Sequence, residues 1–118
     1  MRTGELNTKY LTRGDTYKEV LQFTSNKTPM ELSLFTDIRM DIRDGKTTKS
    51  PLLYSVSLGD GIEIHSTDDS VLIITIDKSE TTKWSSKQYY RDIKFTTSED
   101  EEYTYARGSI QVYENKTL

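Results

Sequence analysis

The last third of the chain holds two long runs in which apolar and polar residues alternate, at residues 88–97 and 102–114. A period of two is that of a β-strand, because successive side chains of a strand point to opposite faces of the sheet. The acidic segment 98–101 lies between the runs and has the length of a hairpin connection. The pair therefore predicts a closing β-hairpin and constrains the chain to a fold built on antiparallel strands.

Shorter alternating runs fill most of the remaining sequence. The clearest is Asp37–Arg43, where three apolar residues, Ile38, Met40 and Ile42, face one way and charged residues face the other. One buried and one solvated face is typical of an antiparallel sheet. Further strands are expected at residues 9–12, 17–24, 52–58, 62–64 and 71–76. The last of these is apolar on both faces and is expected to be a central strand.

Turn-forming residues separate these runs at spacings of 8–12 residues, which is typical of a sandwich or a barrel. Residues 77–86 are the one stretch expected to hold a helical turn, with Ser79 as its cap and Trp84 pointing inward. Residues 30–35 are ambiguous, and an extended lead into the next strand is expected. The pattern predicts an all-β fold, an immunoglobulin-like antiparallel β-sandwich of about seven to nine strands, in a single domain over residues 1–118.

Composition narrows the classes of partner. The formal net charge is −3 with both signs interspersed, which disfavours nucleic acid and an anionic membrane surface as partners. The absence of cysteine excludes a disulfide framework and thiolate metal sites. The densest apolar run, Val71–Ile76, is far shorter than a membrane span, and the first residues have no apolar signal-peptide region.

Residues suited to catalysis are few. His65 is the only histidine, so neither a nucleophile–base arrangement nor a zinc site has its usual residues. The segment 99–102 is acidic but lacks the spacing of a calcium loop, and we interpret it first as a solvated loop and second as a docking feature. We therefore expect no enzyme activity, no cofactor and no metal site.

The carboxylates of Asp37 and Asp41 share one strand face with Arg39 and Arg43. An acid–base pair is one interpretation of such carboxylates. Cross-strand ion pairing on a solvated sheet is the interpretation we favour, because opposite charges on one strand face pair readily with neighbouring strands.

Tyrosine and arginine alternate with other polar residues in both strands of the closing hairpin. These residue types are enriched in the energetic centres of protein interfaces, and aromatic rings also stack on sugars. Cross-strand aromatic packing is the competing interpretation. Half of the residues must face the core, and the sequence leaves open which half. The candidates for protein contact are Tyr89, Tyr90, Arg91, Tyr103, Tyr105 and Arg107.

Six short motifs occur in a fixed order. They are RGDT at 13–16, an isoleucine–arginine strand at 38–43, GDGI at 59–62, a T-x-x-W segment at 81–84 and the two closing strands. Together they resemble a small β-sandwich domain of tailed-bacteriophage virion proteins, related to the N-terminal domain of phage baseplate upper proteins. The resemblance spans roughly residues 9–112. The chain departs from it at Arg91, where an aromatic residue is usual, and at the acidic rather than glycine-rich tip of the closing hairpin.

The resemblance implies a stand-alone structural or adaptor protein of a bacteriophage particle, on the head, neck or tail. Its expected partners are other virion proteins and copies of itself, and its expected location is the virion, after synthesis in the bacterial host cytoplasm. The resemblance offers no catalytic residues. A host-surface carbohydrate-binding module remains the alternative, in which the hairpin aromatics would stack on a host glycan.

Overall fold

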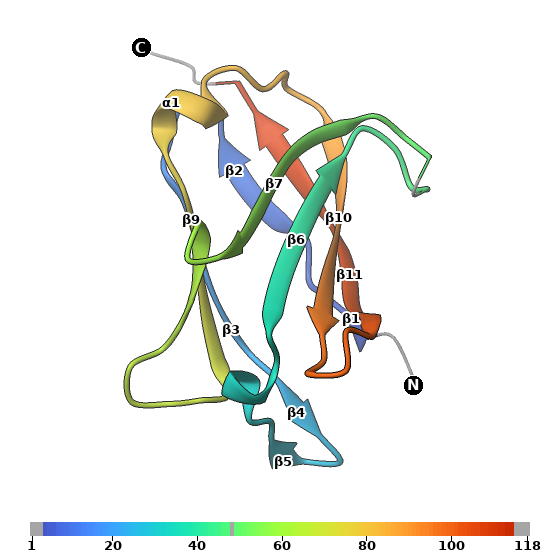
Figure 1. Cartoon of the computed structure of the whole chain (residues 1–118). Coiled ribbons are helices and arrows are strands. Elements are labelled where there is room, and N and C mark those ends of the chain that lie inside the picture. Colours follow the sequence, from blue (N-terminus) through green and yellow to red (C-terminus); the bar gives the residue numbers. More distant parts are fainter. Residues whose placement is uncertain (1–3, 48, 115–118) are drawn as a thin grey trace.

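The structure is a computed structural model, and it describes residues 4–47 and 49–114. Two β-layers face each other across an apolar core, with a short helix at one end and a small hairpin at the other (Figure 1). The alternation seen in the sequence is the cause of this arrangement. Each long strand buries every second side chain between the layers and leaves the others outside.

The front sheet contains the closing hairpin. Its order is β1 and β2 on one edge, then β11, β10, β6 and β7. The strands are β1 (Gly4–Glu5), β2 (Lys9–Thr12), β6 (Asp37–Arg43), β7 (Leu52–Leu58), β10 (Gln88–Thr96) and β11 (Glu102–Tyr113). β10 pairs antiparallel with β11 and β6, whereas β1 and β2 run parallel to β11.

The back sheet consists of β8 (Gly61–Ile64), β9 (Val71–Ile76) and β3 (Tyr17–Gln22). β7 links the two sheets, because most of its length pairs antiparallel with β6 while its last two residues, Ser57 and Leu58, pair parallel with β8. Nine strands of the described residues thus form one continuous sheet that curls into two layers, with eight along a single path and β2 paired with β11 beside it. The prediction of an immunoglobulin-like β-sandwich is confirmed.

Three short elements differ from the sequence predictions or were not foreseen. The helix α1 (Lys78–Thr81) is capped by Asp77, whose carboxylate accepts from the backbone N–H of Ser79, so the prediction of Ser79 as the cap is wrong. Asp and Ser are both good caps, and the sequence offered both. Within the ambiguous stretch 30–35, Leu32–Leu34 forms a 3₁₀ turn (η1).

A two-residue hairpin, β4 (Thr24–Ser25) with β5 (Thr28–Pro29), extends beyond the sandwich. Its turn residues Asn26 and Lys27 both have positive φ. The strand predicted at residues 17–24 therefore ends earlier, at Gln22.

The core is filled by the inward side chains of both sheets, together with Trp84, which is 1% exposed as predicted. β10 contributes Ile93 and Phe95, and β6 contributes its three apolar residues. β9 lies between β8 and β3, as a central strand should. Its residues Leu72, Ile74 and Ile76 are buried, whereas Val71 and Ile73 on its other face are half-buried.

The turn from β7 to β8 gives a direct test of the packing between the sheets. Gly61 has φ +96°, and a β-carbon there would lie 2.6 Å from Cγ1 of Val56, a core residue. We predict that Gly61→Ala lowers the free energy of unfolding by about 1–3 kcal/mol through the backbone. Overpacking against Val56 adds about 1–3 kcal/mol more. Urea unfolding of the purified chain measures the loss.

Gly59 is the matched control, because it also has positive φ, +83°, but has open space where its β-carbon would be. Gly59→Ala should show the backbone cost alone. Equal losses in the two variants would contradict the assigned contact with Val56.

Candidate contact face

The outer surface of the front sheet carries the polar half of the closing hairpin. On β10 the buried residues are Tyr89, Arg91, Ile93 and Phe95, so the residues between them point outward. A groove of about 810 Å³ lies on this surface. We call it the contact face and define it by the outward residues along the groove, which are Arg43, Lys46, Gln88, Tyr90, Asp92, Arg107 and Ser109.

Strand register sets the order of side chains across the contact face. Tyr90 is paired with Arg43 of β6 on one side and with Ser109 of β11 on the other. One row further along, Asp92 is paired with Asp41 and with Arg107. Directly opposite residues in a sheet have side chains close enough to interact. The face is therefore a regular grid of aromatic, acidic and basic groups.

Asp41 is buried rather than solvated, with 3% of its surface exposed. Its carboxylate accepts a hydrogen bond from Oγ of Ser55 at 2.8 Å and lies 3.2 Å from Nε of Arg39 and 3.5 Å from Nη2 of Arg43. The predicted pairing across strands is therefore corrected. The arginines are Asp41's neighbours along its own strand, and they close over its charge, because a buried carboxylate needs compensation.

Asp92 lies on the same face and is half-buried, with one carboxylate oxygen buried and without a hydrogen bond among the described residues. Burial raises the pKa of this carboxyl above its ordinary value; the nearby charge of Lys94 opposes the shift and that of Asp41 adds to it. The carboxylate of Asp41 is thus buried beneath two arginines, and that of Asp92 is half-buried beside it, near the charges of Lys94, Arg43 and Arg107.

Tyr90 and Arg107 are the predicted contact residues that belong to the contact face. Tyr90 is half-buried, and Nζ of Lys46 lies 5.6 Å from the centre of its ring. Arg107 is exposed, and its guanidinium makes no hydrogen bond or ion pair with the described residues, although its charge acts to lower the pKa of Asp92. An aromatic ring and an exposed guanidinium on one face are residue types enriched in the energetic centres of interfaces.

Tyr103 and Tyr105 lie at the other end of the hairpin and are half-buried. The ring of Tyr105 stacks on Phe95 with centroids 4.3 Å apart, and burial raises the pKa of its hydroxyl. The hydroxyl of Tyr103 donates to Glu101 at 3.2 Å, and the negative charge of Glu101 raises its pKa. Tyr105 therefore packs on the edge of the core, in keeping with the packing interpretation.

Tyr89 and Arg91 are each only 3% exposed, which corrects their place among the contact candidates. The hydroxyl of Tyr89 accepts from the backbone N–H of Ser85 at 3.0 Å, and its ring packs near Trp84. Both residues are in phase with Ile93 and Phe95, and this phase determines that they point into the sandwich.

The guanidinium of Arg91 is the centre of a buried polar cluster. It donates to the hydroxyl of Tyr17 at 2.8 Å, to the carboxylate of Glu19, and to the carbonyl of Asn7 at 3.0 Å. Burial raises the pKa of the Tyr17 hydroxyl, which therefore stays protonated. The cluster joins β10 to β3 and to the segment between β1 and β2.

Gly108 provides the space that this cluster needs. It is the register partner of Arg91 on β11, and a β-carbon there would lie 2.9 Å from Cβ of Leu6 and 3.5 Å from Nε of Arg91. Only a residue without a side chain lets the chain before β2 lie this close to β11.

Two exposed tyrosines were missed by the sequence analysis. Tyr10 on β2 and Tyr113 at the end of β11 are 64% and 50% exposed, and their rings are stacked with centroids 6.1 Å apart. Both are out of phase with the buried residues Leu11 and Val112, and this phase is the signal in the sequence that points to an outward position.

The remaining candidates for chemistry make local hydrogen bonds. Nδ1 of His65 accepts from the backbone N–H of Thr67 at 3.1 Å. In the RGDT turn, Nε of Arg13 donates to the carbonyl of Thr82, and Oγ1 of Thr81 donates to the carbonyl of Asp15. Within residues 4–47 and 49–114, no group of three or more His, Cys, Asp or Glu is placed to hold a metal ion. No helix in this part of the chain is long and apolar enough to cross a membrane.

Comparison with known proteins defines the class of the fold. No protein-family model matches the chain, and no curated protein matches it. The structure is similar to that of CopC from Methylosinus trichosporium OB3b, with a TM-score of 0.53 and 11% identity over 94% of this chain and 88% of that one. At this identity the likeness concerns the fold alone, and the chain is a β-sandwich protein of the immunoglobulin-like class.

A second similar structure is that of Drosophila OTK, extracellular domains 3–5. Its TM-score is 0.37, and its identity is 19% over 96% of this chain and 34% of that one. We draw nothing further from an alignment of that quality.

The buried cluster predicts a large effect of removing one charge. Glu19→Gln keeps the side-chain shape but leaves Arg91 buried without its carboxylate. We expect a loss of about 3–5 kcal/mol in the free energy of unfolding, because an uncompensated buried charge is costly. Urea denaturation measures it.

Glu63→Gln on the exposed side of β8 is the matched control and should leave stability unchanged within about 0.5 kcal/mol. The double change Glu19→Leu with Arg91→Met should be less destabilising than Glu19→Gln, since it removes both charges. A Glu19→Gln variant as stable as the parent would show that Arg91 does not depend on this carboxylate.

Proposed function

We propose that the chain is a structural or adaptor domain that acts through protein–protein contacts made by the contact face. The observation that carries the proposal is the position of Tyr90 and Arg107 over a groove on a rigid three-stranded platform. The strands fix the backbone that carries these side chains, so no loop has to be ordered on binding, and this lowers the entropic cost of a contact. The sandwich core is complete without them, so the face is available to a partner.

We further propose that the setting is a bacteriophage particle, with the chain as an accessory component of head, neck or tail. This step rests on the ordered motifs of the sequence that resemble a phage virion domain. In a particle, many symmetric copies add weak individual contacts into stable attachment. The contact face is suited to such a role, because its polar groups tolerate exposure to water before assembly.

The direct test is the presence of the chain in purified phage particles. We expect the chain to sediment with virions, and its copy number to match the symmetry of head, neck or tail. Quantitative mass spectrometry measures the copy number, and electron microscopy locates the chain in the particle. Tyr90→Ala and Arg107→Ala should each weaken incorporation by about tenfold or more, since losses above about 1.4 kcal/mol are usual at the energetic centre of an interface.

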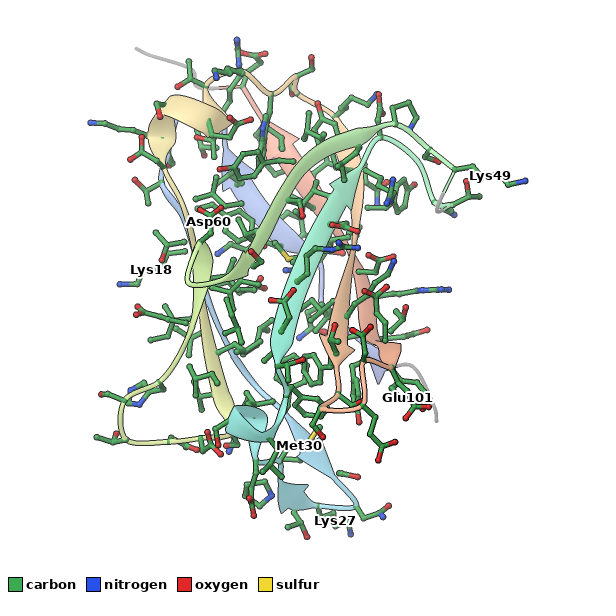
Figure 2. All side chains as sticks on the ribbon, viewed as in Figure 1. Lys18, Lys27, Met30, Lys49, Asp60 and Glu101 are labelled. Carbon is green, nitrogen blue, oxygen red and sulfur yellow. The ribbon has the colours of Figure 1, made fainter. Side chains whose placement is uncertain are left out.

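Lys18→Ala is the matched control for these two variants. Lys18 is exposed on β3, away from β10 and β11 (Figure 2), and should incorporate normally. Particles that lack the chain altogether would overturn the virion role. Incorporation unaffected by Tyr90→Ala and Arg107→Ala would overturn the assignment of the contact face.

A host-surface carbohydrate-binding module is the second candidate, and the pair Tyr10 and Tyr113 favours it. Two stacked, exposed aromatic rings offer an apolar surface on which a sugar ring packs. The side chains of Gln111 and Gln88 are on neighbouring strands in the same row as Tyr10 and carry amide groups able to bond sugar hydroxyls.

Isothermal titration with host-surface glycans tests this candidate. Saturable binding that Tyr10→Ala and Tyr113→Ala each reduce by about tenfold or more would support a sugar platform, by analogy with bases, whose stacking on an aromatic side chain is worth about 1–3 kcal/mol. Val20→Ala, which removes a similarly exposed apolar side chain on β3, is the control. No heat of binding in the parent chain would remove the module from consideration.

A further inference from the structure

We infer that the contact face receives the acidic hairpin tip of a second copy of this chain, so that copies join head to tail. The hairpin tip is defined as residues 99–102, which end the turn after β10 and include the first residue of β11. The inference rests on the proposed role in protein contact and adds the partner, the surface it presents and the symmetry of the assembly.

The solvent side of the contact face is cationic although the chain as a whole is acidic. Asp41 is buried and Asp92 is half-buried, whereas Arg107 and Lys46 are exposed. Glu5, on the rim beside Arg107, is the exposed acid along the groove. Asp41 and Asp92 both contribute to the formal net charge of −3. A partner that approaches from solvent, however, contacts the guanidinium of Arg107 and the ammonium of Lys46.

The hairpin tip is the opposite case, because its four acidic side chains are all exposed. The side chains of Glu99 and Asp100 make no hydrogen bond or ion pair with the described residues. Glu102 is 3.8 Å from Lys94, and Glu101 accepts from Tyr103. At least two carboxylates are therefore free for a partner, and like charges so close together favour a cationic surface nearby.

The tip is held in one shape before any partner arrives. The backbone N–H groups of Glu99 and Glu101 both donate to Oγ1 of Thr97, at 3.3 and 3.2 Å. The N–H of Thr97 donates to the carbonyl of Glu101 at 2.8 Å, and Asp100 has φ +64°. A preformed acidic turn loses little ordering entropy when it docks, which favours a specific contact over a diffuse one.

The tip cannot reach the groove of its own chain. The two strands that carry the tip, β10 and β11, also form the floor of the groove, so the distance between the two is fixed by their hydrogen-bonded ladder. Glu101 marks the tip at the lower end of these strands in Figure 2, while Lys49 marks the β6–β7 loop, whose residues 45–47 line the groove, at the other end. The complementary charges therefore pair only between molecules.

A contact between two different surfaces of identical chains is heterologous. It closes into a ring when the rotation between copies allows and otherwise continues as a filament. A ring of copies around a symmetric particle is one outcome, and concentration-dependent oligomers of the purified chain are the observable consequence in solution.

Sedimentation velocity over a range of concentrations, at low and at high salt, tests the inference. The parent chain should self-associate, and salt should weaken the association because exposed charges are screened. Glu99→Lys at the tip and Arg107→Glu on the contact face should each raise the dissociation constant about tenfold or more. Glu63→Lys and Lys18→Glu, charge reversals of the same size on the back sheet, should leave it unchanged.

Mixing the two interface variants separates this contact from a general charge effect. In an equimolar mixture, the new lysine at the tip of the Glu99→Lys chain meets the new glutamate in the groove of the Arg107→Glu chain. The unchanged tip of the Arg107→Glu chain likewise meets the unchanged groove of the Glu99→Lys chain. Oligomers should therefore return in the mixture, and they should also form in the double variant.

Two results would overturn the inference. One is a parent chain that stays monomeric to about 1 mM. The other is the failure of both the mixture and the double variant to associate.

These outcomes are distinct from those of the proposed function. A chain found in particles but monomeric in solution would keep the virion role and remove the self-contact. A chain that oligomerises through the tip but is absent from particles would keep the self-contact and remove the virion role.

Discussion

The structure depends on one buried charge. The guanidinium of Arg91 lies inside the sandwich, where an isolated cation would cost several kcal/mol. Its acceptors come from three places in the chain: Tyr17 and Glu19 on β3, and the carbonyl of Asn7 before β2. Because each acceptor must be in position at once, this residue fixes the spacing of the two sheets and the path of the first strands. It also explains why β11 carries Gly108 opposite.

β10, the strand that carries Arg91, contributes to both the core and the contact face. Inward residues of β10 build the core and the arginine cluster, and outward residues of the same strand, Tyr90 and Asp92, build the contact face. A partner that binds outside therefore rests on a strand anchored inside by both apolar packing and ion pairing. Rigid support of this kind is what keeps a small set of exposed side chains in place for recognition.

Much of the fold was predictable, because the period of two is unbroken in β6 and is marked by Ile93 and Phe95 in β10. The contact residues were harder to place. The charge of Arg91 indicated a position on the surface, whereas its place in the alternation of β10, in phase with Ile93 and Phe95, indicated the core. The side chain is in the core because Glu19, on a distant strand, compensates its charge. That partner is 72 residues away in sequence and leaves no local signal. Asp41 is similar, since its burial depends on Ser55 of the next strand. Short elements such as η1 are set by loop packing rather than by any pattern in their own residues.

The passage of β7 from one sheet to the other has a consequence for how the molecule opens. On that side the two layers share a continuous backbone ladder and cannot separate without breaking it. On the opposite side, among the described residues, β2 and β3 share no ladder and are joined by side chains, such as Nζ of Lys9 on the carbonyl of Lys18. The two layers of the sandwich are therefore hinged along β7, and β1 and β2 lie at the open edge on the opposite side. Amide hydrogens of β1 and β2 should become accessible to solvent through partial openings that leave β6 and β10 closed.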